Sequence, residues 1–276
     1  MFTKRGPVHE TKKEGGGTKH NVTDGDEPRK SMGYRMTYAR LIGALFIAGF
    51  VVYGAGFGLT SSVISAPNFL STISAHQGTL ILGAFLMMLV APVDVGKAIL
   101  FYPIVENHGK RTALAYLAAM IVEVVLMTLG ALFLLMLVPL GQSAVGAGVA
   151  NALGSLLTET NTMAYQISQL SLGIGAFFLC WLLFRTRLIP QWLAGLGVIG
   201  YALHAAGAIA EIFGIPISLI LLIPGGIFEL TVAFWLLIKG FNPEAYAKGF
   251  QPEASGGRAE EEVVMTPTVR PAPAKL

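Results

Sequence analysis

Long apolar runs with almost no charge inside them constrain this chain more than any other feature of its sequence. Six such runs lie at about residues 40–60, 77–104, 112–139, 163–184, 191–213 and 216–239. About 20 apolar residues are enough to cross a bilayer as one helix. Only 13% of the chain is charged, whereas soluble domains carry about 25%. We therefore expect an all-α membrane protein, a six-transmembrane-helix bundle whose partner is the lipid bilayer.

The two ends of the chain differ from its middle. Residues 1–36 and 250–276 are polar and charged, so they cannot bury enough apolar surface to become ordered. We expect a disordered tail at each end and one membrane domain over residues 38–242. Within this domain the second run is too long for a single upright crossing, so we expect it to tilt, or to kink at Pro92.

Basic residues divide the connections between the runs into two sets. Of the 19 Lys and Arg residues, nine lie in residues 1–40, two at 110 and 111, two at 185 and 187, and five from 239 onward. The opposite connections at 61–76, 140–162 and 214–215 contain none. Cytoplasmic connections of membrane proteins carry the excess of Lys and Arg. The pattern predicts that both termini are cytoplasmic.

The longest outer connection, residues 140–162, has two interpretations. Apolar residues at 145, 149, 153 and 156 share one helical face, which favours a short helix lying on the outer surface. Glycines at 146, 148 and 154 favour a flexible loop instead.

Polar residues inside the apolar runs are the candidates for function, because charged groups at membrane depth are rare and mostly face the bundle interior. A helix rises about 1.5 Å per residue, which places Glu123, His204 and Glu229 near one layer at the bilayer centre. Asp94 and Lys97 lie nearer the cytoplasmic side. The candidate proton- or ligand-site residues are Glu229, Asp94, Glu123, His204, Lys97, Gln169 and Glu211.

The spacing of these residues leaves alternatives open. Asp94 and Lys97 are three apart and can pair on one helical face, but Lys97 can equally extend to the headgroups with Asp94 as its partner. In the fifth run, glycines at 197, 200 and 207 share a stripe with His204, which is typical of close helix packing. We expect the Pro-Gly-Gly sequence at 224–226 to break the sixth run one turn before Glu229, and broken helices often line a cavity.

The charges inside the runs do not balance. Four carboxyl groups accompany one lysine and one histidine, so they cannot all be ionised and paired. We expect some of Glu123, Glu211 and Glu229 to carry protons. Such a set is typical of a proton relay or a cation site, and also of protonated glutamates that are hydrogen-bonded to neighbouring helices.

Other kinds of site find little support. Cys180 is the only cysteine, so a cysteine-based metal site or internal disulfide is excluded. No HExxH or clustered His/Asp spacing occurs. We expect no metal, no cofactor and no nucleic-acid partner. The formation of a homo-oligomer stays open.

Three segments resemble a known family. They are APVDVGKAILFYPIVENHGKRTALAYLAAMIVE, LLFRTRLIPQWLAGLGVIGYAL and IPGGIFELTVAFWLLIKGFN. The matching anchors are Asp94, then Arg185, Arg187, Leu188 and Pro190, and then Pro224, Glu229 and Trp235 to Gly240. Over about residues 38–242 the chain resembles the multi-pass family called domain of unknown function 4386, in which Lys97 would be an apolar residue. The resemblance implies a bacterial or archaeal plasma-membrane protein and no particular activity.

Three classes of function remain. The best supported is a small-solute or ion-coupled carrier, or a ligand-binding bundle, with a protonatable core. The second is a membrane sensory or partner-binding protein that transports nothing. An intramembrane enzyme has the least support, because no Gly-x-Ser-x-Gly sequence or His-rich set is present.

Overall fold

The computed structural model describes residues 26–65 and 69–250, and these residues form helices without any β-strand. Most of both predicted tails, residues 1–25 and 251–276, lies outside the described residues. The helices are α1 (Asp26–Ile64), α2 (Phe69–Met88), α3 (Val90–Leu135), α4 (Leu137–Gly141), α5 (Ala147–Thr186), α6 (Gln191–Ile212), α7 (Ser218–Ile238) and α8 (Pro243–Phe250). The prediction of an all-α chain is confirmed for this part.

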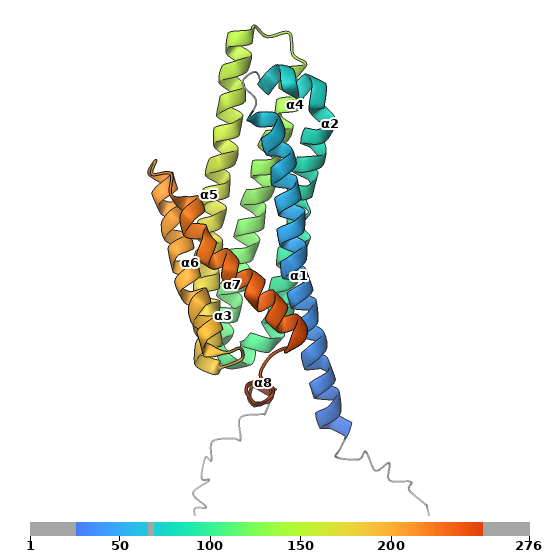
Figure 1. Cartoon of the computed structure of the whole chain (residues 1–276), viewed down its shortest axis with the longest axis vertical. Coiled ribbons are helices and arrows are strands. Elements are labelled where there is room, and N and C mark those ends of the chain that lie inside the picture. The colour runs from blue at the N-terminus through green and yellow to red at the C-terminus, as the bar shows by residue number, and fades with distance from the viewer. Residues whose placement is uncertain (1–25, 66–68, 251–276) are drawn as a thin grey trace, which may run out of the picture.

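Helix α3 folds back on itself at Gly109. The backbone of Gly109 leaves the helical region, with φ −178° and ψ 79°. The rings of Phe101 and Tyr116 lie 6.1 Å apart, whereas a straight helix would separate residues 15 positions apart by about 22 Å. The segments before and after Gly109 are therefore antiparallel neighbours (Figure 1). The reversal falls just before Lys110 and Arg111, where a turn was predicted.

Five helical stretches are long and apolar enough to cross a membrane. They are Tyr34–Ile64, Thr72–Gly141, Ala147–Thr186, Gln191–Ile212 and Ser218–Ile238. The second is 70 residues long and contains the reversal at Gly109. Its first part is also interrupted at Leu89, between α2 and α3. This interruption lies three residues before Pro92. A proline ring clashes with the carbonyl group of the preceding helical turn, which kinks or breaks the helix there.

Several helices extend beyond the predicted spans. Helix α1 begins at Asp26, inside the segment 1–36 that we expected to be disordered. Helix α5 is 40 residues long and includes most of the predicted connection 140–162. Extending a helix that has already formed costs little, because nucleation is the costly step. The N-terminal part of α5 continues the line of the same helix above the α6–α7 turn (Figure 1), so residues 147–162 form neither a separate short helix nor a loop.

Helix α7 is continuous, which corrects the break that we expected at residues 224–226. The helix runs without interruption from Ser218 to Ile238, with Pro224 inside it. The two glycines have different surroundings. A Cβ at Gly200 of α6 would lie 2.9 Å from the Gly225 backbone, so α6 and α7 touch there, whereas a Cβ at Gly226 would have no neighbour within 4 Å. Such close approach is the usual role of glycine between membrane helices.

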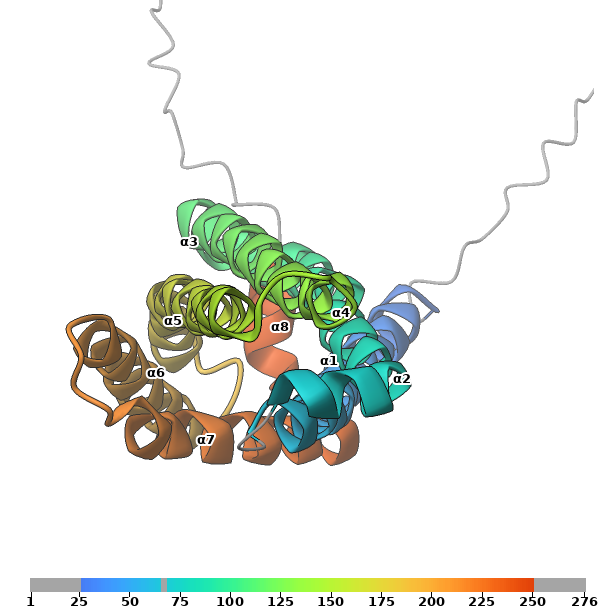
Figure 2. The ribbon, with the colours of Figure 1, turned by 90° about the horizontal axis from the view of Figure 1, so that it is seen from above.

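Helix α7 spans from α6 to α1 and faces α3 and α5 (Figure 2). It meets α1 where a Cβ on Gly43 would lie 2.7 Å from the Ala233 carbonyl oxygen. Further along, α7 is inclined away from α1 (Figure 1). The helices thus touch near one end and leave room between them above that contact.

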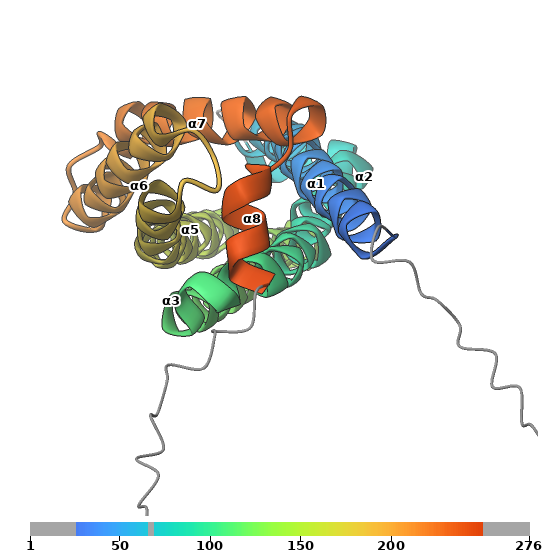
Figure 3. The ribbon, with the colours of Figure 1, turned by 90° about the horizontal axis from the view of Figure 1, so that it is seen from below.

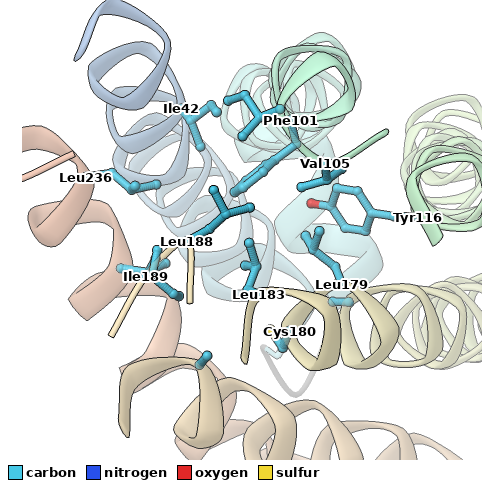
Figure 4. Close-up of a cluster of buried hydrophobic side chains, with 14 of the residues drawn as sticks. Ile42, Phe101, Val105, Tyr116, Leu179, Cys180, Leu183, Leu188, Ile189 and Leu236 are labelled. Carbon is cyan, nitrogen blue, oxygen red and sulfur yellow. The ribbon is translucent and has the colours of Figure 1, made fainter. Parts of the chain in front are cut away.

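An apolar core closes the end of the bundle that carries the basic turns. Ile42 of α1, Phe101 of α3, Leu183 of α5 and Leu236 of α7 meet there, together with Leu188 (Figure 4). Helix α8 lies across this end (Figure 3). The side chain of His108 holds α8 in place through its Nε2, 3.0 Å from the Ala245 carbonyl oxygen. Any cavity above this core is therefore closed on the basic side.

Candidate functional site

A cavity of about 200 Å³ lies above this core, between α1, α3, α5, α6 and α7. Six of the seven candidate residues line it: Asp94, Lys97, Glu123, Gln169, His204 and Glu229. The reversal of α3 brings Asp94 and Lys97 together with Glu123, since the two halves of α3 form adjacent parts of the wall. The residues that the sequence placed near one depth therefore share a cavity.

Asp94 and Lys97 form a buried ion pair. The Lys97 Nζ atom lies 2.7 Å from Asp94 Oδ1, and Lys97 and Asp94 are only 5% and 7% exposed, respectively. The ammonium group also lies 4.4 Å from the centre of the Phe46 ring, where a cation is attracted by the ring face. Lys97 therefore points into the cavity wall and does not extend to the headgroups.

Glu123 is the carboxyl group without a full set of partners. Its side chain is 2% exposed, and its Oε2 atom has no hydrogen-bond partner among the described residues. Asp94, Lys97 and Glu229 are all near enough to interact with it electrostatically. A buried polar group without a partner is costly, so the carboxyl group of Glu123 is the part of the wall that a proton or a ligand partner would stabilise most.

Glu229 is held by a neighbouring tyrosine. Its Oε1 atom accepts a hydrogen bond of 2.5 Å from the Tyr201 hydroxyl group. The close contact of Gly200 with Gly225 brings α6 and α7 together one residue before Tyr201 and one turn before Glu229. The Pro-Gly-Gly sequence therefore positions Glu229 by allowing close packing, and a break in α7 is not needed.

His204 and Gln169 join α6 to α5 across the cavity. His204 Nε2 lies 2.8 Å from Gln169 Oε1, and this oxygen can only accept, so Nε2 carries the proton. Gln169 Nε2 donates in turn to Ser168 Oγ at 3.3 Å. His204 and Gln169 are each 6% exposed. Together they form a polar part of the wall of the cavity that also holds the acidic residues.

Glu211 is the candidate that the structure places elsewhere. It does not line the cavity; its Oε2 atom accepts a hydrogen bond from the backbone N–H of Ser218 at 3.3 Å. A carboxylate at a helix N-terminus satisfies a free donor and complements the helix dipole. Glu211 is therefore accounted for as a cap of α7.

A smaller pocket leads from the cavity toward this cap. Its volume is about 60 Å³, and it shares Tyr165, Gln169, His204 and Leu222 with the cavity. Its remaining wall includes Gln166 and Ser218, which are hydrogen-bonded to each other at 3.2 Å. Polar groups thus continue from the cavity to the α6–α7 turn, away from the basic end.

The wall contributed by α1 was not predicted from the sequence. Phe46, Gly49, Phe50, Tyr53 and Gly54 all line the cavity, and their spacing of i, i+3, i+4, i+7 and i+8 is that of one helical face. The first run contains no charged residue to mark that face, but its aromatic and glycine stripe was visible. Tyr165 was also missed; its ring stacks on Tyr53 with centres 6.0 Å apart.

The cavity-bearing part of the chain coincides with a family match. The family model named Domain of unknown function (DUF4386) matches residues 41–240. The chain belongs to this family. The matched DUF4386 region begins inside α1 and ends after α7, so it contains all seven candidate residues and leaves out α8. No curated protein and no solved structure matches the chain.

The chemistry available in this DUF4386 protein is acid–base and electrostatic. Within residues 26–65 and 69–250, no three His, Cys, Asp or Glu residues are grouped so as to hold a metal ion. Three carboxyl groups, one ammonium group and one histidine share a small cavity with mainly apolar and aromatic walls. Such a site can exchange protons with a bound solute or hold the solute by charge.

Proposed function

We propose that this membrane protein crosses the plasma membrane six times and keeps both termini in the cytoplasm. The two antiparallel halves of α3 count as separate crossings, which turns the five apolar stretches into six. The turns at the end closed by α8 are the reversal of α3 and the connections that follow α5 and α7. They carry Lys110, Arg111, Arg185, Arg187 and Lys239, and the positive-inside rule favours a cytoplasmic location for such an end. Trp181 and Trp192, both exposed near this end, fit an interfacial aromatic belt.

We further propose that the protein is a carrier that binds a small solute in the cavity and couples its movement to protons. The observation that carries this proposal is the unpartnered Glu123 Oε2 atom, which no described residue contacts by a hydrogen bond, in a cavity that is closed on the basic side. The cost of a buried, isolated carboxylate is removed either by a proton or by a ligand. The two therefore compete for Glu123, and this competition is the coupling that an ion-linked carrier needs.

Filling the cavity is expected to abolish this coupling. A Cβ at Gly54 or at Gly58 of α1 would meet no atom within 4 Å, but only Gly54 lines the cavity. In proteoliposomes that enclose a pH-sensitive dye, a panel of amines, amino acids, sugars and sodium is added outside. We expect at least one solute to move protons with the wild type and with Gly58→Leu, and none to do so with Gly54→Leu.

The same assay separates the carrier from the sensory alternative. If no solute moves protons, but one raises the unfolding temperature of the wild type and not that of Gly54→Leu, the cavity binds without transporting and the sensory function is favoured. If no solute does either, or if Gly54→Leu behaves like the wild type, the cavity is not a ligand site and both proposals fail.

A further inference from the structure

We propose that the ligand of this cavity is a small organic amine, with its ammonium group on Glu123 and an apolar, ring-sized body against the aromatic wall. This inference rests on the proposed function, because it concerns the same cavity.

The charges of the wall favour a cation. Lys97 is already neutralised by Asp94 at 2.7 Å, and Glu229 already accepts the Tyr201 hydroxyl group. Glu123 is left with a buried oxygen atom, Oε2, that accepts no hydrogen bond from any described residue. An anion would meet three carboxyl groups there, and a neutral solute would leave the Glu123 carboxyl without a charged partner.

The rest of the wall favours an organic cation over a metal ion. Hard metal cations require about six or more oxygen ligands in close geometry, whereas this wall is mostly apolar and aromatic. Tyr53 and Tyr165 stack on each other, and both interact electrostatically with Glu123. Both tyrosines line the same cavity as Glu123, so their rings form an apolar surface against which the body of an amine held by Glu123 would rest.

The size of the cavity limits the amine. A protein cavity of about 150 Å³ accommodates benzene, and this one is about 200 Å³. A single ring with a short aminoalkyl arm therefore fits, whereas drug-sized ligands need pockets of about 300 Å³ or more. When the amine binds as an ammonium ion, the O–H bond of protonated Glu123 breaks, its proton passes to the buffer base, and the bonds of the amine are unchanged.

Calorimetric titration of the full-length protein in detergent micelles tests this inference. The probes are phenethylamine, its neutral analogue 2-phenylethanol, the anion 3-phenylpropanoate and sodium chloride. We expect phenethylamine to bind at one site per chain, at least about tenfold more tightly than 2-phenylethanol, because the hydroxyl group of the alcohol can donate a hydrogen bond but carries no charge to neutralise the carboxylate. Its binding heat should depend on the ionisation enthalpy of the buffer, as proton release requires.

Three variants assign the binding to the cavity and to Glu123. Glu123→Gln should reduce phenethylamine affinity to that of the alcohol. Gly54→Leu should abolish binding in the cavity, so any heat that remains with this variant measures partitioning of the amine into the micelles. Gly58→Leu should bind phenethylamine as the wild type does. Leucine is a good helix former and meets open space at both glycines, so these variants fold, which gel filtration verifies.

Four results would overturn the inference. Equal binding of amine and alcohol would do so, as would unchanged amine affinity in Glu123→Gln. If the alcohol, the anion or sodium binds instead and Gly54→Leu prevents it, the amine assignment fails while the proposed function stands. If none of the probes binds, the amine assignment also fails, and the proteoliposome panel decides the proposed function separately.

Discussion

Replacing Asp94 with asparagine is expected to lower the free energy of unfolding by about 3–5 kcal/mol, the usual cost of removing one partner from a buried ion pair. The Lys97 ammonium group would lose the negative charge at 2.7 Å and keep only a neutral amide oxygen and the Phe46 ring. Lys97 is only 5% exposed, so water in the cavity replaces the lost partner only in part. Denaturant unfolding in mixed micelles, followed by tryptophan fluorescence, measures the loss.

A double substitution controls for the ion pair itself. Lys97→Met alone should also be destabilising, because it leaves the Asp94 carboxylate unpaired. Asp94→Asn combined with Lys97→Met removes both charges and should regain most of the stability, since apolar replacements of a buried pair are often neutral or better. Single variants within about 1 kcal/mol of the wild type would contradict the buried pair, as would a double variant whose losses simply add.

Unlike Asp94→Asn, Glu123→Met is expected to stabilise the protein. It should raise the free energy of unfolding by about 1–3 kcal/mol, because it removes the cost of leaving a buried polar group unsatisfied. Methionine has a similar length and needs no hydrogen bond, whereas Glu123 Oε2 has no partner in the described structure. The same substitution should eliminate solute-driven proton movement. Functional sites commonly give up stability in this way.

The matched comparison for Glu123→Met is Glu229→Met. Both residues are glutamates of the same cavity wall, but Glu229 accepts the hydrogen bond of the buried Tyr201 hydroxyl group. Its removal leaves that hydroxyl group unsatisfied, so Glu229→Met should be less stable than the wild type. If both variants shift in the same direction, hydrogen bonding does not distinguish the two acids and the role given to Glu123 is wrong.

The charged residues, the histidine and the glutamine of the cavity wall could be predicted because such a residue is conspicuous in an apolar run. Counting along a helix from the basic turns gave the depths of Glu123, His204 and Glu229, and helices of near-regular rise preserve those depths in the fold. The turn after residue 109 was visible for the same reason, since Lys110 and Arg111 interrupt the apolar pattern.

The remaining features depend on tertiary packing, which the pattern along one helix does not contain. The α1 wall is made of aromatic residues and glycines that look the same whether they face lipid or a cavity. The path of α7 through Pro224 depends on the contact of Gly200 with Gly225, two residues from different helices. Glu211 was included among the candidate site residues because it is an acid in an apolar run. Its partner is a backbone N–H group of α7, and no side-chain motif in the sequence indicates such a partner.

The upright extension of α5 has a similar cause. Of the four apolar residues expected on one helical face, those at 149, 153 and 156 lie in α5, whereas Val145 precedes the helix, and all four are exposed in the structure. What the sequence could not provide is the direction of the segment, because an exposed apolar face fits both a helix lying on a membrane and the continuation of a spanning helix.

The claim that the buried acids line a solute-binding cavity is tested most directly by measuring whether water reaches the cavity wall. In a Cys180→Ala background, single cysteines replace Gly54 and Gly226 in the cavity wall, Ala98 in the packed core and Ala202 on the outer face of α6. A charged, membrane-impermeant thiol reagent is applied to sealed vesicles from the outer side. Only a hydrated thiol ionises and reacts readily.

We predict that the cysteines at 54 and 226 react at least about tenfold faster than those at 98 and 202, since a thiol in packed protein or in lipid stays protonated. Phenethylamine should protect both cavity positions. Cavity cysteines that react no faster than the one at 98 would mean that the acids are sealed in a dry core, and the account of a solute-binding cavity would be contradicted.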